Sequence, residues 1–176
     1  MHFAFAPLCR KQPRDNFQCG EAELERWIKE KALQQQKKGL SRTFALLDDE
    51  HPEVMVGFYS LSADSLSPSV FPDQFSHQYP SQYPIPAIRL VRLARHNEYK
   101  GKRIGGLLLI DALKCSVDSS KKIGVAVIVV DAKTFTAKNF YQRYGFRIFP
   151  DNSMMLWMRI KDAELTLAPI TETPAL

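Results

Sequence analysis

The segment RLVRLARHNEYKGKRIGGLLL, residues 89–109, decides the fold. It opens as an apolar, strand-like run, passes into the basic loop EYKGKRIGG, and ends in the first turns of an apolar helix. The first N–H groups of a helix have no intrahelical partner, and together with the helix dipole they favour a bound anion. The segment therefore predicts an anion site at a strand–helix junction.

The composition of this loop supports the same prediction. Glycine lets a backbone approach a ligand closely because it has no Cβ, and the glycines here are Gly101, Gly105 and Gly106. Positive charge comes from Lys100, Lys102 and Arg103. The spacing matches neither GxxxxGK followed by Ser or Thr nor GxGxxG, so nucleoside triphosphates and NAD are disfavoured as ligands.

The neighbouring segments complete a βαβ unit. Residues 87–95 predict one strand, and the continuous apolar run of residues 124–132 predicts a second strand that is buried on both faces. A helix is predicted between them over residues 104–117, so we expect the two strands to be parallel neighbours. The predicted core face of this helix consists of Leu107, Leu108, Ala112 and Cys115.

The remaining segments add antiparallel strands and two more helices. Further strands are predicted over residues 2–8, 42–47, 54–62, 146–150 and 154–160. Helices are predicted within residues 17–39 and over residues 137–145, each of them stopped by a glycine. In the first of these helices, one apolar face is formed by Leu24, Trp27, Ile28 and Ala32.

The whole pattern predicts one α/β domain over residues 1–160, with a central mixed β-sheet and helices on both faces. Residues 63–86, rich in serine and proline, form an irregular loop that we expect to be functional or mobile. Residues 161–176 are expected to be a loose C-terminal tail.

Composition excludes several classes of protein. No apolar run reaches the roughly 18 residues that a membrane span needs, and residues 1–16 lack the features of a signal peptide. We therefore expect a soluble, cytoplasmic protein with no membrane partner. Three cysteines without a CxxC pair and four scattered histidines indicate neither a disulfide framework nor a metal site.

The net charge of +5 is unevenly spread along the chain. Residues 87–147 hold 13 Lys or Arg against four acidic residues. Such an excess attracts polyanions, of which CoA and RNA are two, although solvated faces without a partner give the same count.

Taken together, these elements resemble the GNAT superfamily of N-acetyltransferases. The family's Q/R-x-x-G-x-G/A loop, which grips the pyrophosphate of acetyl-CoA, aligns with residues 100–105. Lys100 stands at the Q/R position, and Arg103 stands where a glycine is usual. The resemblance implies acetyl-CoA as co-substrate and implies a coenzyme-binding set of Lys100, Gly101, Lys102, Arg103, Ile104, Gly105 and Gly106.

A second motif near the C-terminus resembles the family's A-x-x-F-Y-x-x-x-G-F signature. It is NFYQRYGF, residues 139–146, and Tyr141 matches the tyrosine that points toward the CoA sulfur. The resemblance implies that Tyr141 is the catalytic residue and that Asn139 contacts CoA. An aromatic residue that merely packs on the sheet is the alternative for Tyr141.

The front half is similar to the tRNA-acetylating toxins of bacterial toxin–antitoxin pairs. The pieces that carry this likeness are FQCG (residues 17–20), SRTFAL (41–46), VGFYSLS (56–62) and RLVRLA (89–94), in that order. The likeness implies a toxin that acetylates the α-amino group of aminoacyl-tRNA and blocks translation. It also implies a ribbon-helix-helix antitoxin and a homodimer.

Acetyl transfer to an amine needs a neutral amine near the thioester, donors for the developing oxyanion, and a proton for the departing thiolate. The resemblance places the pantetheine arm against the backbone of Leu93, Ala94 and Arg95. Tyr141 then protonates the sulfur. Asp131 is the nearest candidate base, and capping of the following turn is an equally good role for it.

The scarcity of candidate bases favours an acceptor whose amine is weakly basic. An α-amine has a pKa of roughly 7.7–8.0, against about 10.4 for lysine, so an aminoacyl ester needs little help to lose its proton. Phosphates of the acceptor RNA are expected to meet a basic set made up of Arg26, Lys29, Lys37, Lys38, Arg42, Arg89 and Arg92. For Arg92, the alternative to RNA binding is an ion pair with a carboxylate. A protein amine or a polyamine as acceptor, and a CoA- or RNA-binding module without catalysis, stay open.

Overall fold

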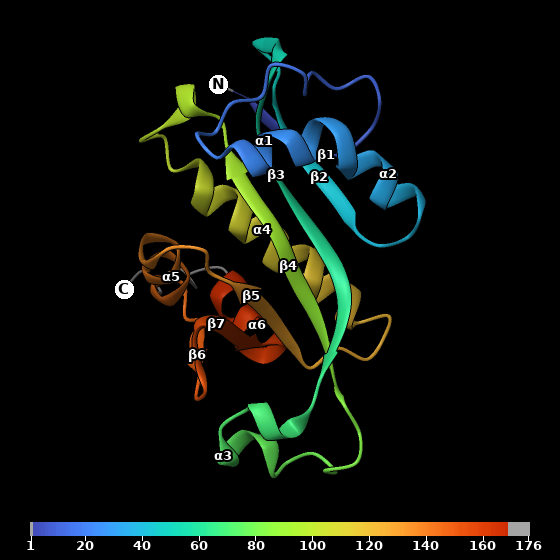
Figure 1. Cartoon of the computed structure of the whole chain (residues 1–176), viewed down its shortest axis with the longest axis vertical. Helices are drawn as coiled ribbons and strands as arrows, with labels where there is room; N and C mark the ends of the chain where they lie inside the picture. The colour runs from blue at the N-terminus through green and yellow to red at the C-terminus, as the bar shows by residue number, and fades with distance from the viewer. Residues whose placement is uncertain (1, 169–176) are drawn as a thin grey trace, which may run out of the picture. The chain divides into compact units, whose positions relative to one another are not determined.

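The computed structural model describes residues 2–168. Within them the chain forms two compact units. The first holds residues up to 63 together with 89–112, and the second holds residues 64–88 and those from 113 onward. The strands of the described residues follow the order β1-β2-β3-β4-β5-β7-β6 in a seven-stranded sheet, which confirms the predicted α/β fold (Figure 1).

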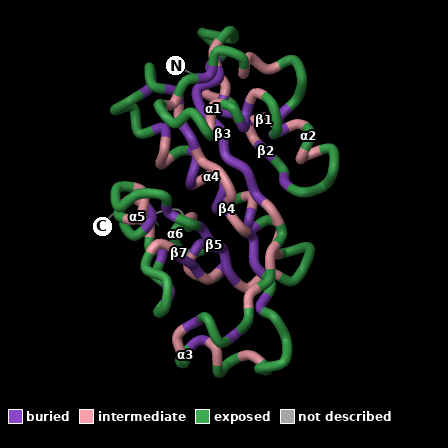
Figure 2. The backbone as a smooth tube through the Cα atoms, in the orientation of Figure 1, coloured by how far each residue is buried: buried purple, intermediate pink, exposed green. Residues whose placement is uncertain are grey.

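The first unit is built on the strands of the predicted N-terminal sheet. Its elements are β1 (Phe3–Pro7), β2 (Arg42–Asp48), β3 (His51–Leu66), whose last residues pass into the second unit, and most of β4 (Ile85–Arg95). β2 pairs antiparallel with both β1 and β3, so the predicted hairpin is confirmed. β3 runs further than predicted, to Leu66, and its stretch from Met55 to Leu61 is buried throughout (Figure 2).

One face of this sheet is covered by the first helical segment, which has three parts. They are α1 (Ala22–Arg26), a π-helical turn η1 (Trp27–Lys31) and α2 (Ala32–Lys37) (Figure 1). Trp27, Ile28 and Ala32 are buried in a cluster with Met55 and Phe58 of β3, while Leu24 packs at its edge. The predicted apolar face of this helix is therefore confirmed.

The FQCG segment, residues 17–20, is hydrogen-bonded to the start of the first helical segment. Phe17 is buried, with its ring 5.2 Å from the ring of Phe58. The backbone N–H groups of Cys19 and Gly20 both donate to Glu25 Oε1, at 2.8 and 2.9 Å. These two bonds lower the pKa of the Glu25 carboxyl, because they stabilise its charged form. FQCG thus has an architectural role in this chain.

The other face of the sheet in the first unit meets α4 (Ile104–Ser120), whose first nine residues belong to this unit. Leu108 and Ala112 are buried there as predicted, but Leu107 is 39% exposed, so its assignment to the core was wrong. Leu109 takes the core position instead, because the buried face of the helix is rotated by about one residue from the predicted one. Tyr59 of β3 donates a hydrogen bond to Asp111 Oδ2 at 2.7 Å and so ties this face to the helix.

The second unit is built on a three-stranded antiparallel arrangement. Its strands are β5 (Val127–Asp131), β6 (Arg147–Phe149) and β7 (Asn152–Arg159), with β7 between the other two. The core is an aromatic cluster that includes Phe71, Phe75, Phe149 and Trp157. Phe71 and Phe75 belong to the predicted irregular loop, which is shorter than expected because η2 (Pro68–Val70) and α3 (Asp73–Ser76) anchor it on this core.

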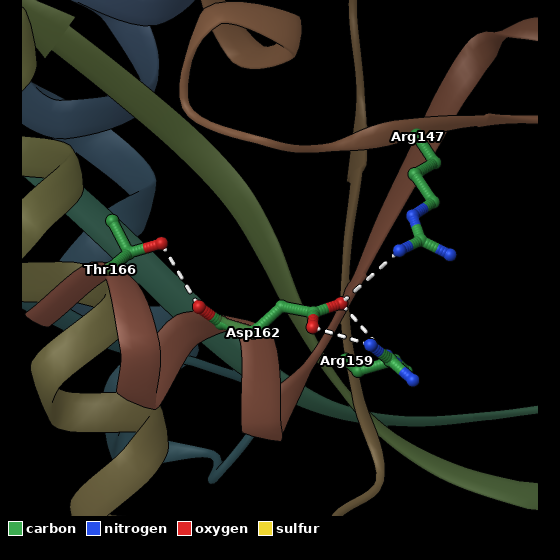
Figure 3. Close-up of polar contacts among 4 residues, drawn as sticks. All are labelled: Arg147, Arg159, Asp162 and Thr166. Atoms are coloured by element: carbon green, nitrogen blue, oxygen red, sulfur yellow. Dashed lines mark hydrogen bonds and ion pairs between the residues drawn. The ribbon is translucent and has the colours of Figure 1, made fainter.

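The C-terminal segment differs from the prediction. Residues 161–167, expected to be loose, belong to helix α6 (Ile160–Leu167), with Ile160 and Ala163 buried. Asp162 holds the start of this helix through a bidentate pair with Arg159, at 2.6 and 2.8 Å, and through Arg147 at 3.7 Å (Figure 3). The remainder of the predicted tail, residues 169–176, lies outside the described residues.

Candidate active site

The predicted anion loop, residues 100–106, lies in the first unit between the end of β4 and the first turn of α4. A short 3-10 turn, η3 (Asn97–Tyr99), precedes it, and α4 begins at Ile104. Lys100, Gly101, Lys102 and Arg103 are all exposed, whereas Ile104 is buried and anchors the helix. The loop therefore presents three cationic side chains beside the N-terminus of a 17-residue helix, where unpaired N–H groups and the helix dipole attract an anion.

The backbone of this loop is turned by two residues with positive φ. Gly101 has φ 81° and Arg103 has φ 58°, and Arg103 is the one non-glycine residue with positive φ among residues 2–168. Arg103 stands at the position where the GNAT motif has a glycine. The loop thus keeps a left-handed turn there although the side chain makes it unfavourable. Gly105 and Gly106, by contrast, lie within α4 in the right-handed region.

The backbone of Leu93, Ala94 and Arg95 forms the end of β4. At this point β3 approaches β4 very closely: a Cβ added to Gly57 would stand 2.8 Å from the carbonyl oxygen of Ala94 and 2.9 Å from Leu108 Cδ1. Gly57 therefore fixes the spacing of the strand that is expected to pair with pantetheine. This role was not predicted, although an isolated glycine inside a strand pattern is a signal of close backbone approach.

Tyr141 lies in the second unit, on α5 (Phe135–Arg143). Thr134 Oγ1 accepts a hydrogen bond from Ala137 N and begins the helix, and Gly145, with φ 92°, ends it. The Tyr141 side chain is 7% exposed, and its ring lies 5.6 Å from that of Phe146. Burial raises the pKa of Tyr141 far above its ordinary value, because the phenolate is poorly solvated there.

Asn139 lies on the exposed face of the same helix. It lines an open hollow with Thr136, Gln142 and Arg143. Asp131, the candidate general base, is exposed at the last position of β5.

A basic groove of about 680 Å³ lies in the first unit, beside the first helical segment. It is lined by Arg10, Arg14, Lys29, Glu30, Leu33, Gln34, Gln36, Lys37 and Arg42. Gln36 joins its walls, because its side chain donates to Leu8 O at 3.0 Å and accepts from Thr43 N at 3.2 Å. We call this feature the basic groove; five of its lining residues are cationic, and Glu30 is the single acidic one.

The groove divides the predicted RNA-binding set. It gathers Lys29, Lys37 and Arg42, and it also includes Arg10 and Arg14, which were not predicted to bind RNA. These two arginines were missed because they lie in the irregular segment after β1, which shows no helical periodicity. Arg14 Nη1 donates to Cys9 O at 3.1 Å, so this segment is folded back on itself.

The other four basic residues do not line the groove. Arg26 is exposed on α1, Lys38 is exposed directly after α2, and Arg89 is half-buried on β4. Arg92 lies 5.4 Å above the Trp27 ring, and its Nη2 is 3.9 Å from Glu23 Oε1. For Arg92 these contacts match the ion-pairing alternative.

Among residues 2–168, no helix is both long enough and apolar enough to cross a bilayer. The same residues contain no group of three or more His, Cys, Asp or Glu side chains placed to hold a metal ion.

Comparison with known proteins agrees with the elements described above. Residues 39–148 match the family model described as an acetyltransferase (GNAT) domain. A tRNA-acetylating toxin of Mycobacterium tuberculosis is 32% identical over 148 residues, which cover 84% of this chain and 86% of that protein.

Solved structures of similar fold were also found. A tyrosine-to-phenylalanine variant of KacT superposes with a TM-score of 0.87 at 25% identity, covering 94% of this chain and 99% of that one. A variant of the toxin AtaT, bound to the C-terminus of the antitoxin AtaR and to acetyl-CoA, has a TM-score of 0.77 at 20% identity, with 93% and 96% covered. The chain described here belongs to the GNAT acetyltransferase family.

Proposed function

We propose that this chain is an acetyl-CoA-dependent N-acetyltransferase that acts as the toxin of a toxin–antitoxin pair. It transfers the acetyl group to the α-amino group of aminoacyl-tRNA and so blocks translation. The similarity to a relative named a tRNA-acetylating toxin supports the reaction. The single structural observation that carries the choice of acceptor is the basic groove, which belongs to the same unit as the anion loop.

The residues present suit acetyl-CoA. The loop of residues 100–106 offers backbone N–H groups and three cations to the pyrophosphate, and the end of β4 offers backbone groups of Leu93, Ala94 and Arg95 to the pantetheine amides. The family resemblance assigns Asn139 of α5, in the second unit, to the same coenzyme. Acetyl-CoA supplies an activated acetyl group as a thioester when it is bound.

Tyr141 acts in this proposal as a hydrogen-bond donor to the sulfur that leaves. Because burial raises the pKa of Tyr141, the phenol stays protonated at physiological pH and can donate its O–H hydrogen bond. Its acidity is then far below that of a thiol, whose pKa is about 8.5, so complete proton transfer to the thiolate is uphill. Stabilisation of the developing negative charge by the phenol O–H is therefore the better account than full protonation.

The acceptor brings its own reactivity. The α-amine of an aminoacyl ester is partly neutral at pH 7, because its pKa is below that of a free α-amine at roughly 7.7–8.0. It attacks the thioester carbonyl, the carbon–sulfur bond breaks, and the amine proton passes to solvent or buffer. This chemistry makes a dedicated general base unnecessary and is consistent with the exposed position of Asp131.

The basic groove holds the acceptor RNA through its phosphates. Arg10, Arg14, Lys29, Lys37 and Arg42 surround one hollow, so they can neutralise several neighbouring phosphates together. The exposed Gln34 side chain adds a hydrogen-bond donor that suits a ribose hydroxyl. Arg26, Lys38 and Arg89 extend the cationic surface outside the groove.

The remaining partners follow from the resemblance. A ribbon-helix-helix antitoxin binds this chain as the second member of the toxin–antitoxin pair. Two copies of the chain form a homodimer in the cytoplasm. Residues 1–160 act as one catalytic domain, to which helix α6 also belongs.

The test uses charge-neutral variants of the groove with a matched control. Lys37→Gln together with Arg42→Gln removes two groove cations, and Lys114→Gln together with Lys161→Gln removes two exposed cations elsewhere. The groove pair is expected to raise the KM for charged tRNA about tenfold or more and to reduce the slope of log affinity against log salt by about two. The control pair is expected to leave both unchanged. Equal behaviour of the two pairs would remove the groove from RNA binding.

A further inference from the structure

The loop that binds the coenzyme pyrophosphate is exposed and turns through a strained residue, so something must hold its shape before the ligand arrives. Tyr99, the residue immediately before the loop, is 5% exposed and so is anchored in the core. Its backbone N–H donates to His96 O at 3.1 Å, and its carbonyl accepts from Lys102 N at 3.3 Å. Tyr99 therefore sets the first turn of the loop through its backbone.

The Tyr99 side chain reaches the loop as well. Lys102 Nζ lies 4.6 Å from the centre of the Tyr99 ring, which is close enough for a cation–π contact. Two further rings lie edge-on to the Tyr99 ring: the centre of the Phe3 ring is 6.0 Å from its centre, and that of the His96 ring is 6.4 Å away. One loop cation is thus positioned by the tyrosine ring.

The hydroxyl of Tyr99 is hydrogen-bonded to a buried carboxylate. It donates to Asp48 Oδ2 at 3.1 Å, and Asp48 Oδ1 accepts from Glu50 N at 3.1 Å. Asp48 is only 1% exposed, and it is the last residue of β2, where it pairs with Phe3 of β1 and with His51 of β3. A buried carboxylate is costly unless it is hydrogen-bonded, so the two partners hold it firmly at the sheet end.

We propose that Asp48 and Tyr99 are positioning residues for the coenzyme: their hydrogen bond joins the anion loop to the end of β2, the middle strand of β1–β3, and preorganises the loop for the pyrophosphate. Neither side chain touches the reacting atoms. Burial and the neighbouring Asp48 raise the pKa of Tyr99 to about 12, so the hydroxyl keeps its proton and the bond persists over the whole physiological pH range. This inference rests on the proposed function only through the identity of the ligand, acetyl-CoA.

The first test is Tyr99→Phe, with Tyr59→Phe as its matched control. Tyr99→Phe keeps the ring, its packing and the contact with Lys102, and it removes only the hydroxyl. Tyr59→Phe also removes a tyrosine-to-aspartate hydrogen bond in the same unit, the one to Asp111, but this bond has no contact with the loop. A general loss of stability would therefore act in both variants.

Acetyl-CoA binding is measured by calorimetry without any acceptor. Tyr99→Phe is expected to raise the Kd about five- to tenfold, the effect of losing one preorganising hydrogen bond, and Tyr59→Phe less than about twofold. At saturating acetyl-CoA, kcat is expected to stay at the wild-type value, because weaker coenzyme binding raises only the KM for acetyl-CoA. Amide hydrogen exchange of residues 100–106 in the unliganded protein is expected to accelerate in Tyr99→Phe and not in the control.

The pairing itself is tested by a double-mutant cycle. Asp48→Ala is expected to weaken acetyl-CoA binding, and its addition to Tyr99→Phe is expected to have almost no further effect, because both changes remove the same hydrogen bond. Wild-type Kd in a folded Tyr99→Phe variant, or equal weakening in Tyr59→Phe, would overturn the inference. Failure of the unmodified protein to bind acetyl-CoA would instead overturn the coenzyme assignment of the proposed function.

Discussion

Arg103 shows how a single residue departs from the pattern of its family while the chain keeps the shape. Its φ of 58° places it in the left-handed region, where an L-residue with a Cβ is disfavoured by about 1–2 kcal/mol. The sequence predicted the loop and its charge, because glycine spacing and basic residues are local signals. It did not predict that arginine would adopt the glycine conformation, since the turn is set by Tyr99 and the start of α4.

Substitution at Arg103 separates backbone strain from charge. Arg103→Gly and Arg103→Ala both remove the guanidinium, but only glycine relieves the positive φ. We expect the free energy of unfolding of the glycine variant to exceed that of the alanine variant by about 1 kcal/mol in urea denaturation. Equal stability of the two variants would contradict the left-handed turn at this position.

Tyr141 leads to a prediction about pH. The proposed donor acts in its protonated form, which persists below its pKa, and burial raises that pKa. Activity should therefore rise as the acceptor amine loses its proton near pH 7–8 and should show no second fall up to about pH 10, where an ordinary tyrosine ionises. The measurement is the pH profile of kcat/KM, and a descending limb near pH 10 that Tyr141→Phe abolishes would contradict this account.

At the scale of elements, the close approach of β3 and β4 depends on one missing side chain. In Gly57→Ala the new methyl group meets backbone, the carbonyl of Ala94, at 2.8 Å. Backbone yields less easily than a side chain, so we expect a loss of about 1–3 kcal/mol in unfolding free energy and weaker acetyl-CoA binding at the end of β4.

Gly124→Ala is the control for this prediction. An added Cβ at Gly124 meets nothing within 4 Å, and its φ is not positive. This variant is expected to be neutral or slightly more stable in the same denaturation experiment. A Gly57→Ala variant that matched it would mean that the strand spacing is adjustable.

Helix α6 depends on the ion pairs in Figure 3. Arg159 lowers the pKa of the Asp162 carboxyl, so the pair stabilises the folded state fully above the unfolded pKa of about 3.9 and loses this effect as pH falls through the folded value. Asp162→Asn is expected to cost about 0.5–1 kcal/mol at pH 7, a small value because Arg147 and Arg159 are well exposed.

The urea titration is repeated at pH 7 and pH 2, with Asp118→Asn as control for an exposed pair with Lys121. The difference between the wild-type protein and Asp162→Asn should shrink at the lower pH, and the control should differ little at either. A constant difference would show that Asp162 acts through packing.

Local signals explain which elements the sequence predicted. The β2–β3 hairpin, β4, α4 and α5 follow from apolar periodicity and from glycines that stop helices, and they are confirmed. Helix α6 was missed because its stability comes from Asp162, Arg147 and Arg159 together, and Arg147 is distant in the sequence. The anchoring of Phe71 and Phe75 was missed for the same reason, since their partners lie on β6 and β7.

At the scale of the whole molecule, charge and family similarity point to one class of substrate. Uneven charge predicted a polyanion but did not distinguish CoA from RNA. The described structure separates two cationic features in the first unit, the loop of residues 100–103 and the basic groove, and Arg10 and Arg14 belong only to the groove. The grouping of Arg10 and Arg14 with the cations of the helical segment could not be predicted from the sequence, because it depends on the fold of the segment that follows β1.

The central claim is acetyl transfer to charged tRNA, and the direct measurement is label transfer from radiolabelled acetyl-CoA to bulk aminoacyl-tRNA. Deacylated tRNA, a polyamine and the Tyr141→Phe variant serve as controls. The account predicts label on the charged pool only, released when the ester is hydrolysed, and lost by more than about tenfold in Tyr141→Phe. Label on the polyamine or on protein, with none on charged tRNA, would contradict it.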